Sequence, residues 1–291
     1  MSELDVTLAD GRTLHLYDEG DPNGVAVVVH HGTPSSGRLY PAQVDDARAR
    51  GIRLIGYDRP GYAGSSAQFG RSVGDAAADV AELLDALDVA RFASWGHSGG
   101  GPHSLACAAL LPERCVAAAA LACPGPYGVE GFDFLEGMGE LNVEEFGTAL
   151  AGAEALEPVI RRNQQAMFSA GPDQLRQALL TVLSPVDQEA FTPEVGAFMY
   201  SIMEEGAGER IEGWRDDDLA FAKPWGFDPA EIRVPVLVLQ GVHDLMVPPA
   251  HARWLAARIP GVEAEISDAD GHITLAIGHI PEVHEWLLER F

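Results

Sequence analysis

The stretch Phe92-Ala-Ser-Trp-Gly96-His-Ser98-Gly-Gly100 decides the fold that we expect for this chain of 291 residues. Its apolar start predicts a short buried strand, and its glycines predict a tight turn. An Ala-rich segment follows and ends near Leu111, directly before Pro112, as a helix would. A strand that leads through a turn into a helix is the repeating unit of a parallel α/β sheet.

The same alternation continues on both sides of this unit. An uninterrupted β-branched run predicts a strand at residues 25–29, and further mainly apolar segments predict strands at residues 52–57, 116–122, 235–239 and 264–266. Polar or amphipathic segments predict helices at residues 41–50, 72–87, 249–258 and 280–287. A capping box of Ser72 and Asp75 is expected to start the second of these helices. Leu8 and Leu14 flank Asp10-Gly11, which is a hairpin signal. The sequence therefore predicts a doubly wound, mostly parallel α/β sheet.

The alternation stops between Tyr127 and Asp228, where Gly, Ala, Glu, Met and aromatic residues replace the β-branched runs. We predict a mostly helical insertion, or cap, over residues 127–228, within a core formed by residues 1–126 and 229–291. The insertion holds 20 acidic and 6 basic residues, so it carries much of the negative charge. Its aromatic and methionine side chains are expected to form a small core, with a few of them facing the cleft.

Charge and cysteine content limit the expected partners and location. The chain has 19 basic and 44 acidic residues, and a net charge of −25 repels both nucleic acid and anionic membranes. We attribute this acidity mainly to solubility. Cys107, Cys115 and Cys123 lie in apolar stretches without a C-x-x-C pair, which predicts buried thiols in a reducing compartment. No signal peptide and no apolar run of about 18 residues is found, so we expect a cytoplasmic protein. We also expect a monomer or homodimer that acts on a small-molecule substrate.

Ser98 is the candidate nucleophile. The pattern G-x-S-x-G between a strand and a helix is the context of a nucleophile elbow, a turn too tight for large side chains two positions from the serine. Gly96 and Gly100 supply that clearance. Ser98 is then exposed at the carboxyl edge of the sheet, over a helix N-terminus whose free N–H groups favour negative charge.

A serine hydroxyl needs a base, and the base needs an orienting acid. His272 follows the strand at residues 264–266, so it emerges at the same sheet edge as Ser98. Six other histidines suit the role less well by their spacing or setting. They are His15, His97, His103 and His279, together with His251 and His284, which are expected at exposed helix positions.

Asp244 is the candidate acid, because it comes directly after the strand at residues 235–239 and so emerges at that edge too. Asp268 and Asp270 remain alternatives, although they lie close to the base in sequence. An acyl-transfer site also needs N–H donors for the oxyanion. The backbone N–H groups of Gly99 and Thr33 are the candidates, the latter in the loop after the strand at residues 25–29.

Neither a metal nor a cofactor is expected. Histidines and aspartates near these loops are of types that bind zinc, but no spacing such as H-E-x-x-H appears. No G-x-G-x-x-G or Walker loop follows a strand, so no nucleotide cofactor is indicated.

The chain resembles the α/β-hydrolase superfamily of serine hydrolases with an inserted cap. The motifs that carry the resemblance span most of the core in family order: His31-Gly-Thr-Pro34, the segment Gly56–Ser65, the elbow Gly96–Gly100, Gly241-Val-His-Asp244 with Pro248, and Gly271-His272. The resemblance implies that Ser98 is the nucleophile, His272 the base and Asp244 the acid, with Thr33 and Gly99 as oxyanion donors. It also places the cap between the sixth and seventh strands. A serine at the elbow argues against the haloalkane dehalogenase and epoxide hydrolase branches, which need a carboxylate nucleophile.

Within this superfamily the chain looks like the hydrolases called proline iminopeptidase-like and like esterases. Peptidases of that group typically carry H-G-G-P-G at the oxyanion loop, whereas this chain has His31-Gly-Thr-Pro-Ser35. We therefore expect a serine hydrolase that cleaves a carboxylic ester or related acyl bond through an acyl-enzyme. One alternative is a proline iminopeptidase-like aminopeptidase, with Glu204 and Glu205 as candidates for binding a substrate ammonium group. Another is a ligand receptor that keeps the triad without turnover.

Overall fold

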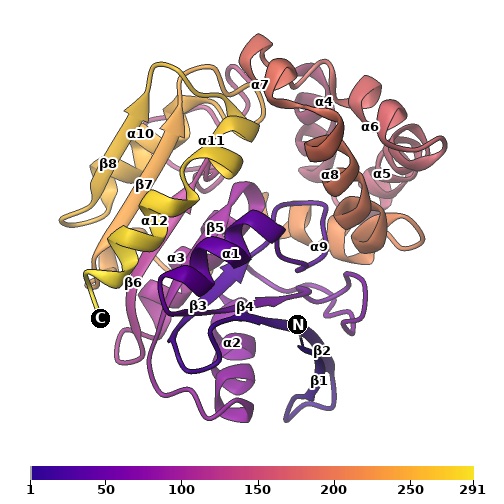
Figure 1. Ribbon diagram of the computed structural model, residues 1–291. Helices are drawn as coiled ribbons and strands as arrows, with labels where there is room; N and C mark the ends of the chain where they lie inside the picture. The colour runs from indigo at the N-terminus through magenta and orange to yellow at the C-terminus, as the bar shows by residue number, and fades with distance from the viewer. Residues whose placement is uncertain (1) are drawn as a thin grey trace.

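The computed structural model describes residues 2–291, and its centre is one eight-stranded sheet (Figure 1). The strand order is β1-β2-β4-β3-β5-β6-β7-β8. The pairs β1–β2 and β2–β4 are antiparallel, and the other neighbours are parallel. The strands are β1 (Ser2–Thr7), β2 (Thr13–Gly20), β3 (Val25–His30), β4 (Ile52–Tyr57), β5 (Phe92–His97), β6 (Cys115–Leu121), β7 (Val236–Gly241) and β8 (Glu263–Ser267). The prediction of a mostly parallel α/β sheet is confirmed.

Helices cover both faces of this sheet because the central strands are apolar on both sides (Figure 1). In β3, Val28 packs with the helices on one face and Val27 with those on the other. The first face carries α2 (Asp75–Ala86), α3 (Gly101–Leu110) and α10 (Pro249–Arg258), and the second carries α1 (Pro41–Ala49) and α12 (Ile280–Leu288). Between β8 and α12 lies the short helix α11 (His272–Gly278).

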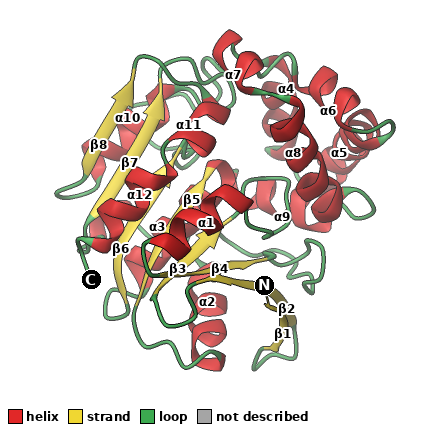
Figure 2. Ribbon diagram, in the orientation of Figure 1, coloured by secondary structure: helices red, strands yellow, loops and turns green. Residues whose placement is uncertain are grey.

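Between β6 and β7 the chain leaves the sheet and forms a body of helices (Figure 2). These are α4 (Glu140–Ala149), α5 (Ala153–Phe168), α6 (Pro172–Leu179), α7 (Pro185–Ala190), α8 (Pro193–Ala207) and α9 (Glu212–Phe221). They enclose a hydrophobic cluster of their own, which includes Leu156, Ile160 and Trp214. Tyr62 and Ile273 from the sheet domain complete that cluster, so the insertion is packed against the sheet domain.

Helix α2 begins later than its sequence pattern predicts. The N–H and hydroxyl of Ser72 do donate to the Asp75 carboxylate, at 2.6 and 2.9 Å, but helical structure starts only at Asp75. The two residues between them form a turn, in which the Gly74 N–H donates to the Trp225 carbonyl at 2.7 Å. This tertiary hydrogen bond holds the segment outside the helix.

The expectation that His251 and His284 are exposed on their helices is wrong, since both are fully buried. His251 on α10 accepts a hydrogen bond from the Gly125 N–H at 2.9 Å. His284 on α12 pairs with Asp46 of α1 at 2.7 Å. Each histidine lies on the side of its helix that packs against another segment of the same chain. Within residues 2–291, none of the helices has both the length and the apolar character needed to span a membrane.

Candidate active site

Ser98 lies in a sharp turn between β5 and α3, in the short 3-10 helix Ser98–Gly100. Its φ of +55° is in the left-handed region, which side chains other than glycine rarely adopt. A Cβ atom on Gly96 would overlap the carbonyl of Gly100, and one on Gly100 would overlap the carbonyl of His30. Both glycines therefore provide the clearance that the sequence predicts for them.

His272 and Asp244 form a buried hydrogen-bonded pair. The imidazole Nδ1 lies 2.8 Å from Asp244 Oδ2. The other carboxylate oxygen accepts the N–H groups of Met246 and Val247, each at 2.8 Å, and Gln240 Nε2 lies 3.1 Å from Oδ2. With Nδ1–H donated to the acid, the free Nε2 of His272 is the atom that can accept a proton.

His272 has a raised pKa, although burial opposes its charged form. The charge and hydrogen bond of Asp244 overcome that burial, and the charge of Asp187 adds to them. A base whose pKa lies above 6.5 keeps a strong affinity for the proton that it must take from a serine hydroxyl.

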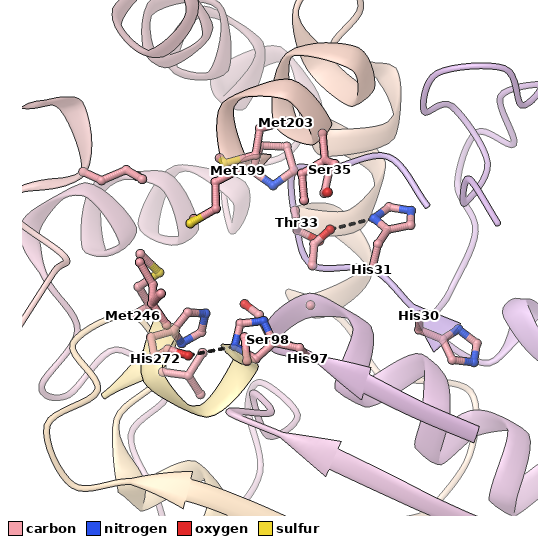
Figure 3. A pocket seen from close by; sticks show the side chains of 18 of the residues that line it. His30, His31, Thr33, Ser35, His97, Ser98, Met199, Met203, Met246 and His272 are labelled. Atoms are coloured by element: carbon pink, nitrogen blue, oxygen red, sulfur yellow. Dashed lines mark hydrogen bonds between the residues drawn. The ribbon is translucent and has the colours of Figure 1, made fainter. Parts of the chain in front are cut away.

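His97, the neighbour of Ser98, holds the backbone of the candidate base, His272. Its Nε2 donates to the His272 carbonyl at 2.9 Å, and the two rings are 4.6 Å apart (Figure 3). Burial, followed by the charge of His272, lowers the pKa of His97 to about 3, so it stays neutral. His97 suits the role of base poorly because it adjoins Ser98, and in the structure its ring instead supports the candidate base.

Thr33 and Gly99 face each other beside Ser98. A Cβ atom on Gly99 would overlap Thr33 Oγ1, so the backbone of Gly99 lies against the side chain of Thr33. Ser98, His272, Thr33 and Gly99 all line one cavity (Figure 3). The four residues that sequence reasoning assigned to attack, proton transfer and oxyanion binding are therefore brought to the same place.

The alternative acids face elsewhere. The Asp270 carboxylate accepts from Ser267 Oγ at 2.5 Å and pairs with His279 at 3.0 Å. Asp268 contributes its carbonyl, which lies 3.0 Å from His243 Nε2. Among residues 2–291, no group of three or more metal-ligating side chains is arranged to hold a metal ion.

Asp217 of α9 reaches from the insertion to the loop that carries Thr33. Thr33 Oγ1 donates to Asp217 Oδ2 at 2.6 Å, and Tyr62 OH donates to the same oxygen at 2.8 Å. Arg59 and Arg71 form ion pairs with this carboxylate, which is fully buried. Burial alone would raise the pKa of Asp217, but the two guanidinium groups hold it well below 3.8. Nothing in the sequence distinguished Asp217 from the other acids of the insertion.

The cavity has a volume of about 240 Å³ and lies between the sheet domain and the insertion. Much of its wall is apolar. The insertion contributes methionine, aromatic and aliphatic side chains, namely Met138, Leu141, Phe146, Met167, Leu179, Val182, Val195, Phe198, Met199, Ile202, Met203, Trp214 and Phe221. As predicted, several methionine and aromatic side chains of the insertion face this cleft.

Two buried acids, Glu145 and Asp218, also line the cavity. Glu145 accepts hydrogen bonds from Trp214 Nε1 and Asn163 Nδ2, both at 2.8 Å. Neither oxygen of Asp218 has a hydrogen-bond partner among the described residues. Burial, and then the charge of Glu145, raises the pKa of Asp218 well above 3.8, and burial raises that of Glu145. The pair is therefore expected to share a proton.

Glu204 and Glu205, the candidates for binding a substrate ammonium group, are outside the cavity wall. Glu204 is exposed, whereas Glu205 accepts from Ser36 Oγ at 2.8 Å and pairs with Arg38. Helix α8 turns these two residues away because its Met199 and Met203 occupy the side that faces the cavity (Figure 3).

Comparisons with known proteins agree with this fold. A non-heme chloroperoxidase from Streptomyces lividans is 34% identical over 152 residues, which is 52% of this chain and 55% of that protein. An epoxide hydrolase from Caballeronia sordidicola is 31% identical over 127 residues, which is 43% of this chain and 38% of that protein. The matches thus span about half or less of the length of these relatives.

One similar solved structure is an alpha/beta hydrolase fold protein from Nakamurella multipartita. It is 27% identical, with a TM-score of 0.64, and the match covers 98% of this chain and 99% of that one. Residues 25–278 match the family described as alpha/beta hydrolase fold. Because that match covers most of the chain, the protein belongs to the alpha/beta hydrolase fold family.

Proposed function

We propose that this protein is a serine hydrolase that cleaves a carboxylic ester through an acyl-enzyme. The observation that carries the proposal is the convergence of Ser98, in its left-handed turn, with the His272–Asp244 pair on one cavity. Thr33 and Gly99 line the same cavity, and we assign their N–H groups as the oxyanion donors. In this arrangement a nucleophile, a base with its orienting acid and an anion site surround the place where an acyl group can bind.

The reaction follows from these roles. Ser98 Oγ attacks the ester carbonyl carbon while His272 Nε2 takes the hydroxyl proton, and Asp244 stabilises the imidazolium. The tetrahedral oxyanion accepts hydrogen bonds from Thr33 and Gly99. When it collapses, the bond to the alcohol breaks and His272 gives its proton to that leaving alcohol. Water, deprotonated by His272, then attacks the acyl-enzyme and releases the carboxylic acid and Ser98.

The serine at the elbow favours acyl transfer over epoxide opening. A carboxylate nucleophile forms an ester with an opened epoxide, and that ester is then hydrolysed. An alkyl ether formed by Ser98 would have no carbonyl for water to attack. The Thr33 and Gly99 donors, by contrast, suit the oxyanion that forms at a carbonyl carbon. The apolar wall of the cavity favours a substrate with an apolar acyl or alkyl group.

Asp218 and Glu145 favour a second candidate, an aminopeptidase. Buried polar atoms without hydrogen bonds cost free energy, and apart from the proton shared with Glu145 the Asp218 carboxyl group at the cavity wall has no hydrogen-bond partner among the described residues. A substrate ammonium group would supply the missing donors and offset the charge that the acid pair retains. In this alternative, the same Ser98 attack would cleave an amide bond next to a free α-amine.

A turnover screen with wild-type protein and Ser98→Ala tests both candidates. We expect multiple turnovers on neutral p-nitrophenyl esters, a clear dependence on acyl length, and stoichiometric labelling of Ser98 by a fluorophosphonate. Ser98→Ala should lose the label and up to about 10⁶-fold in kcat. Labelling that persists in Ser98→Ala would reject the nucleophile, and a single turnover would indicate a receptor.

Proline and alanine p-nitroanilides, run in parallel, separate the esterase from the aminopeptidase. Preference for these free amines over their N-acetyl forms, abolished by Asp218→Asn, would establish the second candidate. Equal, low rates on both forms would leave the esterase proposal in place. Glu204→Gln is the matched control, since it removes an exposed acid of the insertion that does not line the cavity.

A further inference from the structure

The first turn of α11 carries His272 and exposes backbone N–H groups that need partners. The first N–H groups of any helix lack acceptors within the helix, and a side chain just before the helix often supplies one. Here the preceding residue is Gly271, which has no side chain. The acceptor for this turn must come from elsewhere.

Asp187 of α7 supplies that acceptor from the insertion. Its Oδ2 accepts the N–H of His272 at 3.0 Å, and its Oδ1 accepts the N–H groups of Ile273 at 2.8 Å and Thr274 at 3.3 Å. The Asp187 side chain is fully buried, and Ser184 Oγ donates to its Oδ2 at 2.7 Å. One carboxylate thus holds three successive N–H groups of the turn that begins with the base.

Gly271 leaves the space in which the Asp187 carboxylate makes this contact. A Cβ atom at position 271 would overlap all three heavy atoms of the Asp187 carboxyl group. The φ of Gly271 is −111°, so backbone conformation does not demand a glycine there. The absence of a side chain at residue 271 instead makes room for the carboxylate from the insertion.

We propose that Asp187 is a positioning residue for His272, fixing the turn that carries the base and placing a negative charge beside its imidazole. This inference rests on the proposed role of His272 as the catalytic base. It adds a member from the insertion to a proposed catalytic group whose other members, Ser98, His272 and Asp244, belong to the sheet domain. The base is then fully positioned only when the insertion is docked on the sheet.

The groups around His272 let the charge of Asp187 be separated from other effects. Asp244 faces the imidazole from the loop after β7, and His97 faces it from the end of β5, where burial keeps it neutral. His279, which lies between α11 and α12, pairs with Asp270 and with Glu282 instead of with His272. The two negative charges that act on His272 are therefore those of Asp244 and Asp187, and both raise its pKa.

The charge has a consequence for the reaction. When Ser98 attacks, His272 becomes an imidazolium ion, and a fixed carboxylate nearby stabilises that ion. Removing the charge of Asp187 lowers the proton affinity of His272. The acid limb of kcat/KM, which reports protonation of the base in the free enzyme, then moves to lower pH. A residue that only holds the fold would not move this limb.

The test compares Asp187→Asn with Glu189→Gln, an exposed acid on the same helix. One measurement is kcat/KM against pH with the ester that is hydrolysed fastest. The other is the NMR titration of the His272 ring, whose signal is assigned because it is missing in His272→Asn. In Asp187→Asn we expect both midpoints to move to lower pH together, and the plateau kcat to fall about tenfold with KM within about twofold. Glu189→Gln should match wild type.

Gly271→Ala provides a second variant that keeps every charge and only displaces the carboxylate. It should shift the midpoints in the same direction as Asp187→Asn, and it serves alone if Asp187→Asn does not fold. Unchanged midpoints in both variants, or an equal shift in Glu189→Gln, would overturn the proposal. If no acyl ester is hydrolysed, the proposed function fails, but the NMR titration still decides the role of Asp187.

Discussion

The left-handed conformation of Ser98 is costly, and its neighbours are built to hold it. A non-glycine residue at φ +55° costs about 1–3 kcal/mol relative to an ordinary conformation. Gly96 and Gly100 allow β5, the turn and β3 to approach within contact of each other's carbonyl groups. The turn delivers the Ser98 side chain into the cavity instead of into the core. The strain thus accompanies exposure of the proposed nucleophile.

Asp244→Asn is expected to lower kcat about 10⁴-fold while KM changes little. Asparagine keeps the size of the acid, and its oxygen can still accept the N–H groups of Met246 and Val247. The NH2 group that takes the place of Oδ2 cannot accept Nδ1–H, so the imidazole takes the tautomer in which Nε2 carries the proton. Steady-state kinetics of the variant, together with an unfolding curve that confirms a stable fold, measures this effect.

Asp268→Asn and Asp270→Asn are the controls for the acid. Both stay within roughly tenfold of wild type, about 1.4 kcal/mol, because their contacts go to His243, Ser267 and His279 instead of to His272. If kcat falls by much more than tenfold in one of these controls while Asp244→Asn retains activity, the acid has been assigned to the wrong residue.

Helix α9 is the element that joins the insertion to the loop that carries Thr33, a proposed oxyanion donor. Asp217 contacts Thr33, 184 residues away in sequence, as well as Arg59 and Tyr62. Buried ions are stable in proteins only when paired and hydrogen-bonded, and Asp217 satisfies both conditions. The same contacts hold the loop that presents the Thr33 N–H.

Asp217→Asn is expected to lower the free energy of unfolding by about 3–5 kcal/mol, because it leaves Arg59 and Arg71 buried without their counter-charge. Denaturant unfolding measures this loss, and Asp173→Asn, an exposed acid on α6, is the matched control. A loss of less than about 1 kcal/mol would show that water or a rearranged loop compensates for the missing charge.

The acidic residues that give the molecule its net charge of −25 are of two kinds, exposed and buried. Many acids are exposed, but the insertion also buries five, namely Glu145, Asp187, Asp216, Asp217 and Asp218. The exposed acids repel one another, whereas buried Asp187 and Asp217 hold parts of the proposed site. Attributing the acidity of the insertion mainly to solubility therefore overlooks these buried members.

Raising sodium chloride from about 50 to 300 mM is expected to raise Tm by a few degrees, because salt screens repulsion among the exposed acids. The kcat/KM for a neutral ester should change less than about twofold over the same range, because a neutral substrate is not steered by charge. Calorimetry and initial rates measure the two quantities. A falling Tm, or a strong effect on the neutral ester, would contradict this division of charge.

Local sequence patterns determined the sheet, its order of elements and the proposed triad. Alternating apolar runs fix which segments become strands, and chain direction in a parallel sheet sends the ends of β5, β7 and β8 to one edge. Ser98, Asp244 and His272 follow those ends, so their meeting could be predicted without coordinates. The need for glycine at Gly96 and Gly100 was predictable because a tight turn leaves no room for side chains on the residues next to it.

Only the tertiary structure decided which acids and histidines are buried and with what. Asp187 and Asp217 occur among many acids of a helical segment, and helical periodicity gave no reason to choose them. Their partners, His272 and Thr33, lie 85 and 184 residues away. His251 and His284 were misplaced for the same reason. The energy of a buried polar group depends on the partner that packing brings to it, and that partner is not encoded near it in the sequence.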